Sequence, residues 1–438
     1  MNFANQQHVI NKKMVLLKKE YWTLIILFIV TAMAQASEGY NIELLNYLAV
    51  GIILFYCLTA DEETILYMLM YLMPANRLFG IGGFSVNLLI LLMFFLKGII
   101  INRSKVNKRF VFLSLLFFVY TIMYVWQYHS YQEVLQSIKT FIVLFFCVAM
   151  FNSEKYDLGR LYKYSVVFLA LGIVSNFLIA IIVNPVIFDV RRLIISNDSN
   201  PNALAIVVSY ALAQVVILLN SKHIKNPKGI VIISVVLCLI GLYTQSRTFV
   251  ANFVIILLWL LLPWFKTPFY KSLKRIVIVI FIFTGLFLLF NSSFQISDQL
   301  RVVIDRIIDP SRGDITSGRT EIWSQYIAAF KDSPRILLFG VGMDYTRLGI
   351  YMMAHNMWIE QITNFGIFGT LLVIMLYVSA AKAMLKKSSF KNKYSGAFNL
   401  LPLVVVFASG MFSHSFMALN ITIQLFFGIA TLQLNLAK

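Results

Sequence analysis

Two arginines and one histidine in the C-terminal half of the chain are of types that could do chemistry together. Arg247 stands between two apolar runs, Arg319 lies within a long polar segment, and His355 stands where that segment ends. A guanidinium group is a planar fork that holds phosphate or carboxylate oxygens two at a time. Histidine transfers protons near neutral pH because its ordinary pKa lies there. The two arginines could therefore bind an anionic group, and the histidine could transfer a proton beside it.

Each candidate residue also has an ordinary interpretation. An arginine at the edge of a membrane helix, such as Arg247, either binds an anion or extends its side chain towards water. Arg319 is by default a solvated loop arginine, and an interfacial histidine such as His355 is often only hydrated. A fourth candidate, Arg191-Arg192 followed by Asn200-Pro201-Asn202, is on its own a polar loop before a helix. Sequence spacing alone leaves these alternatives open.

The other histidines and the cysteines do not suggest a metal site. None of the five histidines is spaced like a metal-binding pair. All three cysteines (Cys57, Cys147 and Cys238) fall within apolar runs and are interpreted as small core residues. We therefore expect neither a metal nor a cofactor.

The composition is that of a membrane protein. Of the 438 residues, 60% are hydrophobic and 13% are charged, whereas about a quarter are charged in soluble domains. Apolar runs recur from end to end, which indicates a single polytopic unit. The net charge of +18 comes from lysines in short loops that alternate with balanced ones, the pattern of a protein that spans a membrane. This distribution argues against nucleic-acid binding.

Apolar runs of about 20 residues predict an all-α polytopic membrane protein with about 12–14 transmembrane helices. The third run is the weakest, because Pro74, Asn76 and Arg77 interrupt it, so it is a candidate for a re-entrant or broken segment. Alternation of the spans places both termini and the lysine-rich loops in the cytoplasm. The expected spans are 21–37, 44–60, 64–79, 85–101, 110–128, 134–151, 161–184, 201–220, 229–246, 248–264, 276–290, 355–380, 398–414 and 417–436.

One polar segment, residues 291–354, is much longer than the other loops and is expected on the outer face. It separates an N-terminal helical bundle, residues 1–290, from the C-terminal helices of residues 355–438, all within one integrated membrane domain. Its charges are nearly balanced, and it uses arginine where the cytoplasmic loops use lysine. The arginine bias again favours anion recognition.

Within this loop, residues 319–331 predict a helix. Ser317 or Gly318 would cap its start, and Ser333-Pro334 would stop it. Its apolar residues recur three and four positions apart, which predicts a helix lying on the outer membrane surface. These apolar residues are Ile322, Trp323, Tyr326, Ile327 and Phe330.

Six short motifs follow one another in the C-terminal half. They are Asn200-Pro201-Asn202, Thr244-Gln245-Ser246-Arg247, Ser317-Gly318-Arg319 with Trp323, Leu338-Phe339-Gly340-Val341-Gly342, His355-Asn356 and Phe365-Gly366-Ile367-Phe368-Gly369. In this order, on a scaffold of many helices, they resemble the superfamily of O-antigen ligases and O-antigen or capsular polysaccharide polymerases. The first half of the chain matches that superfamily only as a string of helices.

The resemblance implies an integral-membrane glycosyltransferase that uses glycans carried on undecaprenyl diphosphate, without a metal. It implies that Arg247 and Arg319 hold the donor's diphosphate, with Arg192 a looser candidate for the same anionic surface. Arg319 and His355 would be catalytic, and His355 would activate the acceptor hydroxyl. The expected location is the bacterial cytoplasmic (inner) membrane, with the active site on the periplasmic face. Expected partners are lipid-linked donor and acceptor glycans and membrane lipids, with a chain-length regulator protein as a further candidate.

Three functions are compatible with this resemblance and this composition. A polymerase would move the growing glycan onto a new lipid-linked repeat unit, and a ligase would move it onto lipid A–core or another acceptor. We favour the polymerase, because the helices are aromatic-rich and no basic outer surface for a phosphorylated core is evident. A lipid-linked oligosaccharide flippase is the non-enzymatic alternative. It would place charged residues in many spans, but the first six spans contain few.

Overall fold

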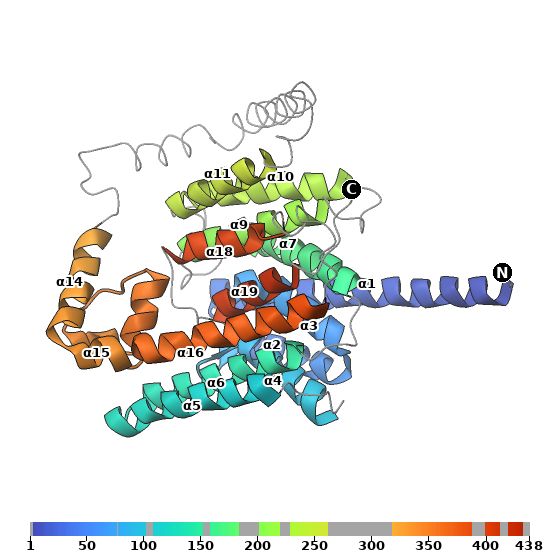
Figure 1. Ribbon diagram of the computed structural model, residues 1–438. Coiled ribbons are helices and arrows are strands. Elements are labelled where there is room, and N and C mark those ends of the chain that lie inside the picture. Colours follow the sequence, from blue (N-terminus) through green and yellow to red (C-terminus); the bar gives the residue numbers. More distant parts are fainter. Residues whose placement is uncertain are drawn as a thin grey trace.

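Helices make up nearly all of the described backbone, as a chain rich in apolar runs requires. In lipid no water is available to bond N–H and C=O groups, so a spanning segment must satisfy them internally. Figure 1 shows the computed structural model, in which the described residues are 3–76, 78–101, 108–151, 158–183, 201–219, 228–261, 318–387, 399–411 and 419–431.

The helices run mostly side by side along one direction (Figure 1). Among the described residues, the only strands are two short ones, β1 (Gly80–Ile81) and β2 (Phe84–Ser85). The helices are α1 (Phe3–Tyr40), α2 (Glu43–Thr59), α3 (Glu62–Leu72), η1 (Met73–Ala75), α4 (Val86–Phe95), η2 (Leu96–Ile101), α5 (Lys108–Tyr128), α6 (Tyr131–Phe151), α7 (Leu158–Val183), α9 (Pro201–Leu219), α10 (Lys228–Tyr243), α11 (Arg247–Leu261), α14 (Arg319–Asp332), α15 (Pro334–Phe339), η5 (Tyr345–Leu348), α16 (Met357–Lys387), α18 (Leu401–Gly410) and α19 (Leu419–Thr431).

The predicted fold class, an all-α polytopic membrane protein, is confirmed. A helix lies in each expected span that falls within the described residues, whereas the span expected at 276–290 lies outside them. Five further apolar helices in the described part of the chain are shorter, so the total of 12–14 spans stays a prediction. The five helices long and apolar enough to cross a membrane are Lys19–Tyr40, Val111–Tyr128, Arg160–Val183, Pro201–Leu219 and Met357–Ser379.

The weak third span is broken, as its sequence indicated. α3 has 11 residues and, at about 1.5 Å per residue, covers roughly half of a hydrocarbon core. The 3-10 turn Met73–Ala75, which contains Pro74, ends it. A tight hairpin follows, because Gly82 and Gly83 both adopt positive φ, the requirement of a two-residue turn. The hairpin pairs Gly80 with Ser85 and Ile81 with Phe84.

α9 lies inside the bundle, packed against α7, α10, α11 and α18. Its buried polar side chains are bonded across helices. The Tyr210 hydroxyl donates to the carbonyl of Gln424 at 2.9 Å, and the Gln214 amide donates to the Tyr210 hydroxyl at 2.6 Å. The Tyr162 hydroxyl of α7 donates to the carbonyl of Gln214 at 2.9 Å. Such bonds hold apolar helices together where burial of apolar surface supplies no driving force.

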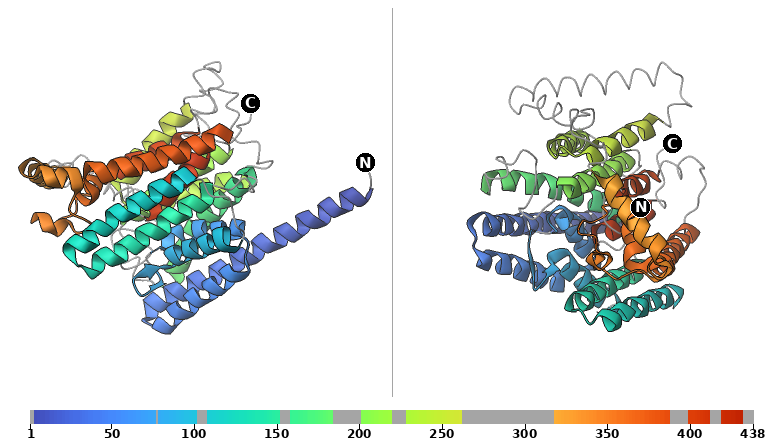
Figure 2. Two further views of the ribbon diagram at one scale, coloured as in Figure 1. Left: turned by 60° about the horizontal axis from the view of Figure 1, so that its bottom comes forward. Right: turned by 90° about the vertical axis from the view of Figure 1, so that its left-hand side faces the viewer.

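α14, α15 and the turn between α5 and α6 gather at one end of the bundle, which we call the α14 end (Figures 1 and 2). The start of α1 points away from the opposite end (Figure 1). α14 runs across the direction of the long helices, as the surface helix expected from the sequence would. Its bounds, Arg319–Asp332, agree with the predicted helix over 319–331.

α16 is sharply bent near its start. Gly366 has φ 61° and ψ −175°, which is not helical. The turns before it run across the bundle beside α14, and the part after it runs along the bundle (Figure 1). The helix expected at 355–380 is present, and its residues Met357–Ser379 are long and apolar enough to cross a membrane, but the bend at Gly366 was not predicted. The motif Phe365-Gly366-Ile367-Phe368-Gly369 marks this bend, because positive φ favours glycine.

The bend persists because its carbonyl groups find other donors. α15 and the loop after it lie directly against the bend. A Cβ on Gly366 would stand 2.3 Å from the carbonyl carbon of Leu338, and a Cβ on Gly340 would stand 2.6 Å from the nitrogen of Gly366. A break within apolar surroundings requires such replacement bonds. The N–H groups of Val341 and Gly342 donate to the carbonyls of Thr363 and Asn364 at 2.8 and 3.0 Å. The carbonyl of Phe365 accepts from the Tyr120 hydroxyl at 2.8 Å. The carbonyl of Gly366 accepts from the Thr370 hydroxyl at 2.6 Å.

We predict that Gly366→Ala destabilises the protein by about 1–3 kcal/mol, because the position combines positive φ with a backbone contact that a Cβ would break. Thermal unfolding of the purified protein in detergent would measure this change. Gly51→Ala in α2 is the matched control, since a Cβ there meets nothing within 4 Å. Equal unfolding temperatures for the two variants would contradict the prediction.

Candidate active site

Arg247 opens α11 directly after a tight turn. α10 ends at Tyr243, and Gln245 in the turn adopts φ 48°. The Ser246 hydroxyl donates to the side-chain oxygen of Asn202, at the start of α9, at 2.8 Å. The structure therefore brings two of the sequence motifs, Asn200-Pro201-Asn202 and Thr244-Gln245-Ser246-Arg247, into contact at the start of α11.

Arg319 opens α14 and is half-buried. The residue before it, Gly318, turns the chain into the helix with φ 77°. Burial lowers the pKa of the Arg319 guanidinium, and the positive charge of Arg247 lowers it further. Two arginines far apart in the sequence therefore lie close enough to repel each other.

The helix starts add to the positive potential around Arg247 and Arg319. Each is the first residue of its helix, and a helix start carries roughly half a positive charge. Cations are normally favoured at the C-terminus of a helix, not at its N-terminus. Two guanidinium groups and two helix starts together make a place where an anion with several oxygens would be stabilised.

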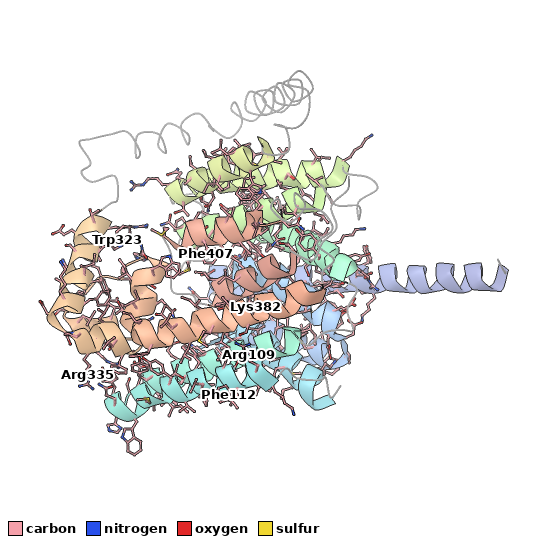
Figure 3. The ribbon with its side chains drawn as sticks, in the orientation of Figure 1. Arg109, Phe112, Trp323, Arg335, Lys382 and Phe407 are labelled. Carbon is pink, nitrogen blue, oxygen red and sulfur yellow. The ribbon has the colours of Figure 1, made fainter. Side chains whose placement is uncertain are left out.

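α14 is fastened to the segment that leads to His355. The indole N–H of Trp323 donates to the carbonyl of Ala354 at 2.8 Å, and the Tyr326 hydroxyl donates to the carbonyl of Met352 at 2.9 Å. Trp323 and Arg335 mark α14 and α15 at this end of the bundle in Figure 3. The expected apolar face is correct except for Ile327, which is 47% exposed. The packed face consists of Ile322, Trp323, Tyr326 and Phe330 against Tyr345, Leu348, Ile350, Ala354 and Ile359.

His355 stands just before α16 in a constrained backbone conformation, with φ 47°. Its N–H donates to the carboxylate of Glu360 at 3.0 Å. Asn356 caps the helix, because its side-chain oxygen accepts from the N–H groups of Trp358 and Ile359 at 3.0 and 3.2 Å. Positive φ in a residue other than glycine is kept only where the surroundings enforce it. Asn356 and Glu360 together enforce it here.

Arg319 and the segment before His355 are thus joined through α14. Arg319 and Trp323 lie four residues apart, on the same face of the helix, about 6 Å along its axis. Trp323 in turn bonds the residue directly before His355. The described residues thus link Arg319 to the His355 segment along α14, and the charge of Arg247 acts on Arg319. The expected meeting of all three side chains at one site stays a prediction. The catalytic and binding roles of these three residues stay predictions.

Two predicted features are not described by the structure. Arg192 and residues 291–317 of the long loop lie outside the described residues. Within the described residues, no group of three histidine, cysteine, aspartate or glutamate side chains could hold a metal ion.

Comparison with known families covers the segment that carries these residues. Residues 230–374, about a third of the chain, match the model of a family described as O-antigen ligase. The match confirms the superfamily that the motifs predicted. It runs from α10 into α16, past the bend at Gly366, and includes Arg247, Arg319 and His355. No curated protein matches the chain.

The match to the O-antigen ligase family indicates a multi-pass membrane enzyme of the glycosyltransferase type. It does not separate ligases from polymerases, because both belong to the superfamily. It also leaves out residues that hold the matched segment in place. The hydroxyl of Tyr124 in α5 donates to the carbonyl of Phe339, and Tyr120 bonds the bend of α16.

Sequence reasoning missed the supporting roles of Glu360, Tyr120 and Tyr124. Glu360 lies in the first turn of α16, where an acidic residue commonly stabilises a helix start. This position was the one sequence feature that could have indicated its role. The tyrosines lie within an apolar run, where nothing local distinguishes a hydroxyl with a distant partner.

We predict that Trp323→Phe lowers the free energy of unfolding by about 1 kcal/mol, because it removes the bond to Ala354 and keeps an aromatic ring. Thermal unfolding in detergent would measure the change. Trp126→Phe is the matched control, since Trp126 in α5 is 81% exposed. The assignment would be wrong if both variants lost the same stability.

We also predict that inorganic pyrophosphate raises the unfolding temperature, because an anion between Arg247 and Arg319 would relieve their repulsion. The increase should saturate with pyrophosphate concentration and disappear in Arg319→Gln and in Arg247→Gln. Chloride at equal ionic strength controls for general screening. An increase that survives in both variants would place the anion elsewhere.

Proposed function

We propose that this protein is a polysaccharide polymerase of the bacterial cytoplasmic membrane. In this proposal it transfers a glycan from undecaprenyl diphosphate onto a lipid-linked repeat unit, and the product is an O-antigen or a capsule. The observation that carries the proposal is that Arg247 and Arg319 each begin a helix, that the charge of Arg247 acts on Arg319, and that α14 is bonded to the segment before His355. This arrangement suits a diphosphate leaving group and a hydroxyl nucleophile.

The proposed reaction exchanges one bond at the anomeric carbon of the donor. Its bond to the diphosphate oxygen breaks, and a bond to the acceptor hydroxyl oxygen forms. Negative charge develops on the departing diphosphate, and cations fixed in place before the reaction lower the barrier most at that point. Arg247 and Arg319 supply these cations without a metal.

His355 would accept the proton of the acceptor hydroxyl. A sugar hydroxyl is a weak nucleophile, and a positioned base adds about 10²–10⁴-fold to the rate. The backbone of His355 is held by Glu360 and by the cap at Asn356, so its position is defined before substrate binds. A periplasmic location of the α14 end would fit the alternation of lysine-rich loops along the chain.

The ligase is the second candidate, favoured by the description of the matched family as O-antigen ligase. The donor half of the reaction is the same in both enzymes, and only the acceptor differs. The proposed roles of Arg247, Arg319 and His355 are therefore unchanged between them.

Deletion of the gene, followed by examination of the surface glycan and of the lipid-linked pool, separates the candidates. Loss of a polymerase should leave single repeat units on the final acceptor. Loss of a ligase should leave long polymer on the carrier lipid, which would replace our proposal by the ligase. Single units stranded on the cytoplasmic face would instead indicate a flippase.

We predict that His355→Ala lowers polymer formation by about 10²–10⁴-fold and that Arg319→Ala abolishes complementation of the deletion strain. Arg319→Lys should retain part of the activity, because lysine keeps the charge but loses the fork. The matched control is Arg335→Ala, an exposed arginine on α15 (Figure 3). With membrane levels equal by immunoblot, full activity of His355→Ala or Arg319→Ala would exclude the proposed site.

A further inference from the structure

A buried carboxylate ties α6 to the loop between α15 and α16. The Oε1 atom of Glu133 accepts from Nη1 of Arg347 at 2.7 Å and from the N–H of Met343 at 3.1 Å. Glu133 is only 3% exposed. A buried charge is stable only when it is paired and hydrogen-bonded, and both donors belong to the same loop. The Glu133 carboxylate therefore keeps both donors only while this loop stays in its observed position.

Arg347 is held from several other directions. Its Nη1 also donates to the carbonyl of Val341 at 2.7 Å, and its guanidinium stands 3.7 Å from the ring centre of Tyr128. Its Nε lies 3.7 Å from a carboxylate oxygen of Asp344. A cation over an aromatic ring adds a further attraction. Arg347 thus joins the turn between α5 and α6 to the loop of residues 340–349.

The ion pair lies against Gly342, a residue that bonds the bend of α16. A Cβ on Gly342 would stand 2.6 Å from Oε1 of Glu133 and 2.8 Å from Nη1 of Arg347. The N–H of the same Gly342 bonds the carbonyl of Asn364 at the bend. A displacement of the pair would therefore be transmitted through Gly342 to the first turns of α16, which begin at Met357, two residues after His355.

We propose that Glu133 is a positioning residue that, through Arg347, fixes the 340–349 loop and with it the place of His355 at the start of α16. The inference rests on the proposed function, because the role of His355 is part of that proposal. A hydrogen-bonded ion pair has one narrow geometry, so it holds a loop more strictly than apolar contact would. Glu133 lies outside the segment 230–374 that matches the family, so the pair joins the N-terminal half to that segment.

The test compares Glu133→Gln with wild type in a purified transfer assay, using lipid-linked glycan extracted from the deletion strain. Glutamine keeps the size and one acceptor oxygen but removes the charge. We expect kcat to fall by up to about 100-fold, the loss that a displacement near 1 Å can cause, with KM for the donor unchanged. A merely structural residue would not separate kcat from KM in folded enzyme.

Glu20→Gln is the matched control. Glu20 is also buried and pairs with Arg160 at 2.9 Å, but it lies in α1, away from the α14 end. We expect it to lose a similar amount of thermal stability and to keep kcat. Should Glu133→Gln fail to fold, Arg347→Lys, which keeps the charge and loses the fork, takes its place with the same expectation.

A second readout does not depend on activity. Spin labels on cysteines introduced at Trp126 and Tyr351, which are 81% and 86% exposed, report the distance between α5 and the segment before His355. This distance should broaden or shift in Glu133→Gln but not in Glu20→Gln. An unchanged distance, or an unchanged kcat in active enzyme, would overturn the positioning role. If wild type transfers no glycan, the proposed function fails, and the distances still decide whether the pair holds the segment.

Discussion

The α14 end depends on one constraint: a broken helix in apolar surroundings must find new partners for its carbonyl groups. Gly366 breaks α16, and the loop after α15 supplies N–H groups from Val341 and Gly342. The approach that makes these bonds possible leaves no room for a Cβ on Gly340 or Gly366. Two glycine motifs that look unrelated in the sequence are thus two sides of a single backbone contact.

This contact determines the geometry of the candidate site. Because α16 bends, its first turns lie across the bundle beside α14 instead of continuing the spanning direction (Figure 1). The bend brings the His355 segment against Trp323 and Tyr326. A straight helix would have carried His355 away from α14, and Arg319 would then have no structural link to it.

Electrostatics give the site its chemical character. Arg247 and Arg319 repel each other, and each stands at the positive start of its helix. The protein keeps this unfavourable arrangement through packing elsewhere: Ser246 bonds Asn202, and α14 is fastened by its aromatic side chains. Positive charge of this kind is what would stabilise a bound anion with several oxygens.

Much of the fold follows from the sequence alone, because local rules govern it. Runs of apolar residues must become helices in lipid, and the helix from Arg319 follows from its caps and its apolar spacing. Pro74 predicted the break after α3, because proline has no N–H group to continue the hydrogen bonds of a helix. The candidate residues Arg247, Arg319 and His355 were also recognisable, since their motifs occur in a fixed order.

The tertiary structure decided which of these residues meet. The proximity of Arg247 to Arg319, the bend at Gly366 and the pairing of Glu133 with Arg347 join positions far apart in the chain. Neither the spacing of apolar residues nor a helix-capping residue predicts such contacts, because they depend on how whole helices pack. The sequence by itself determined the elements and the chemical groups, and only packing determined which of these groups lie near one another.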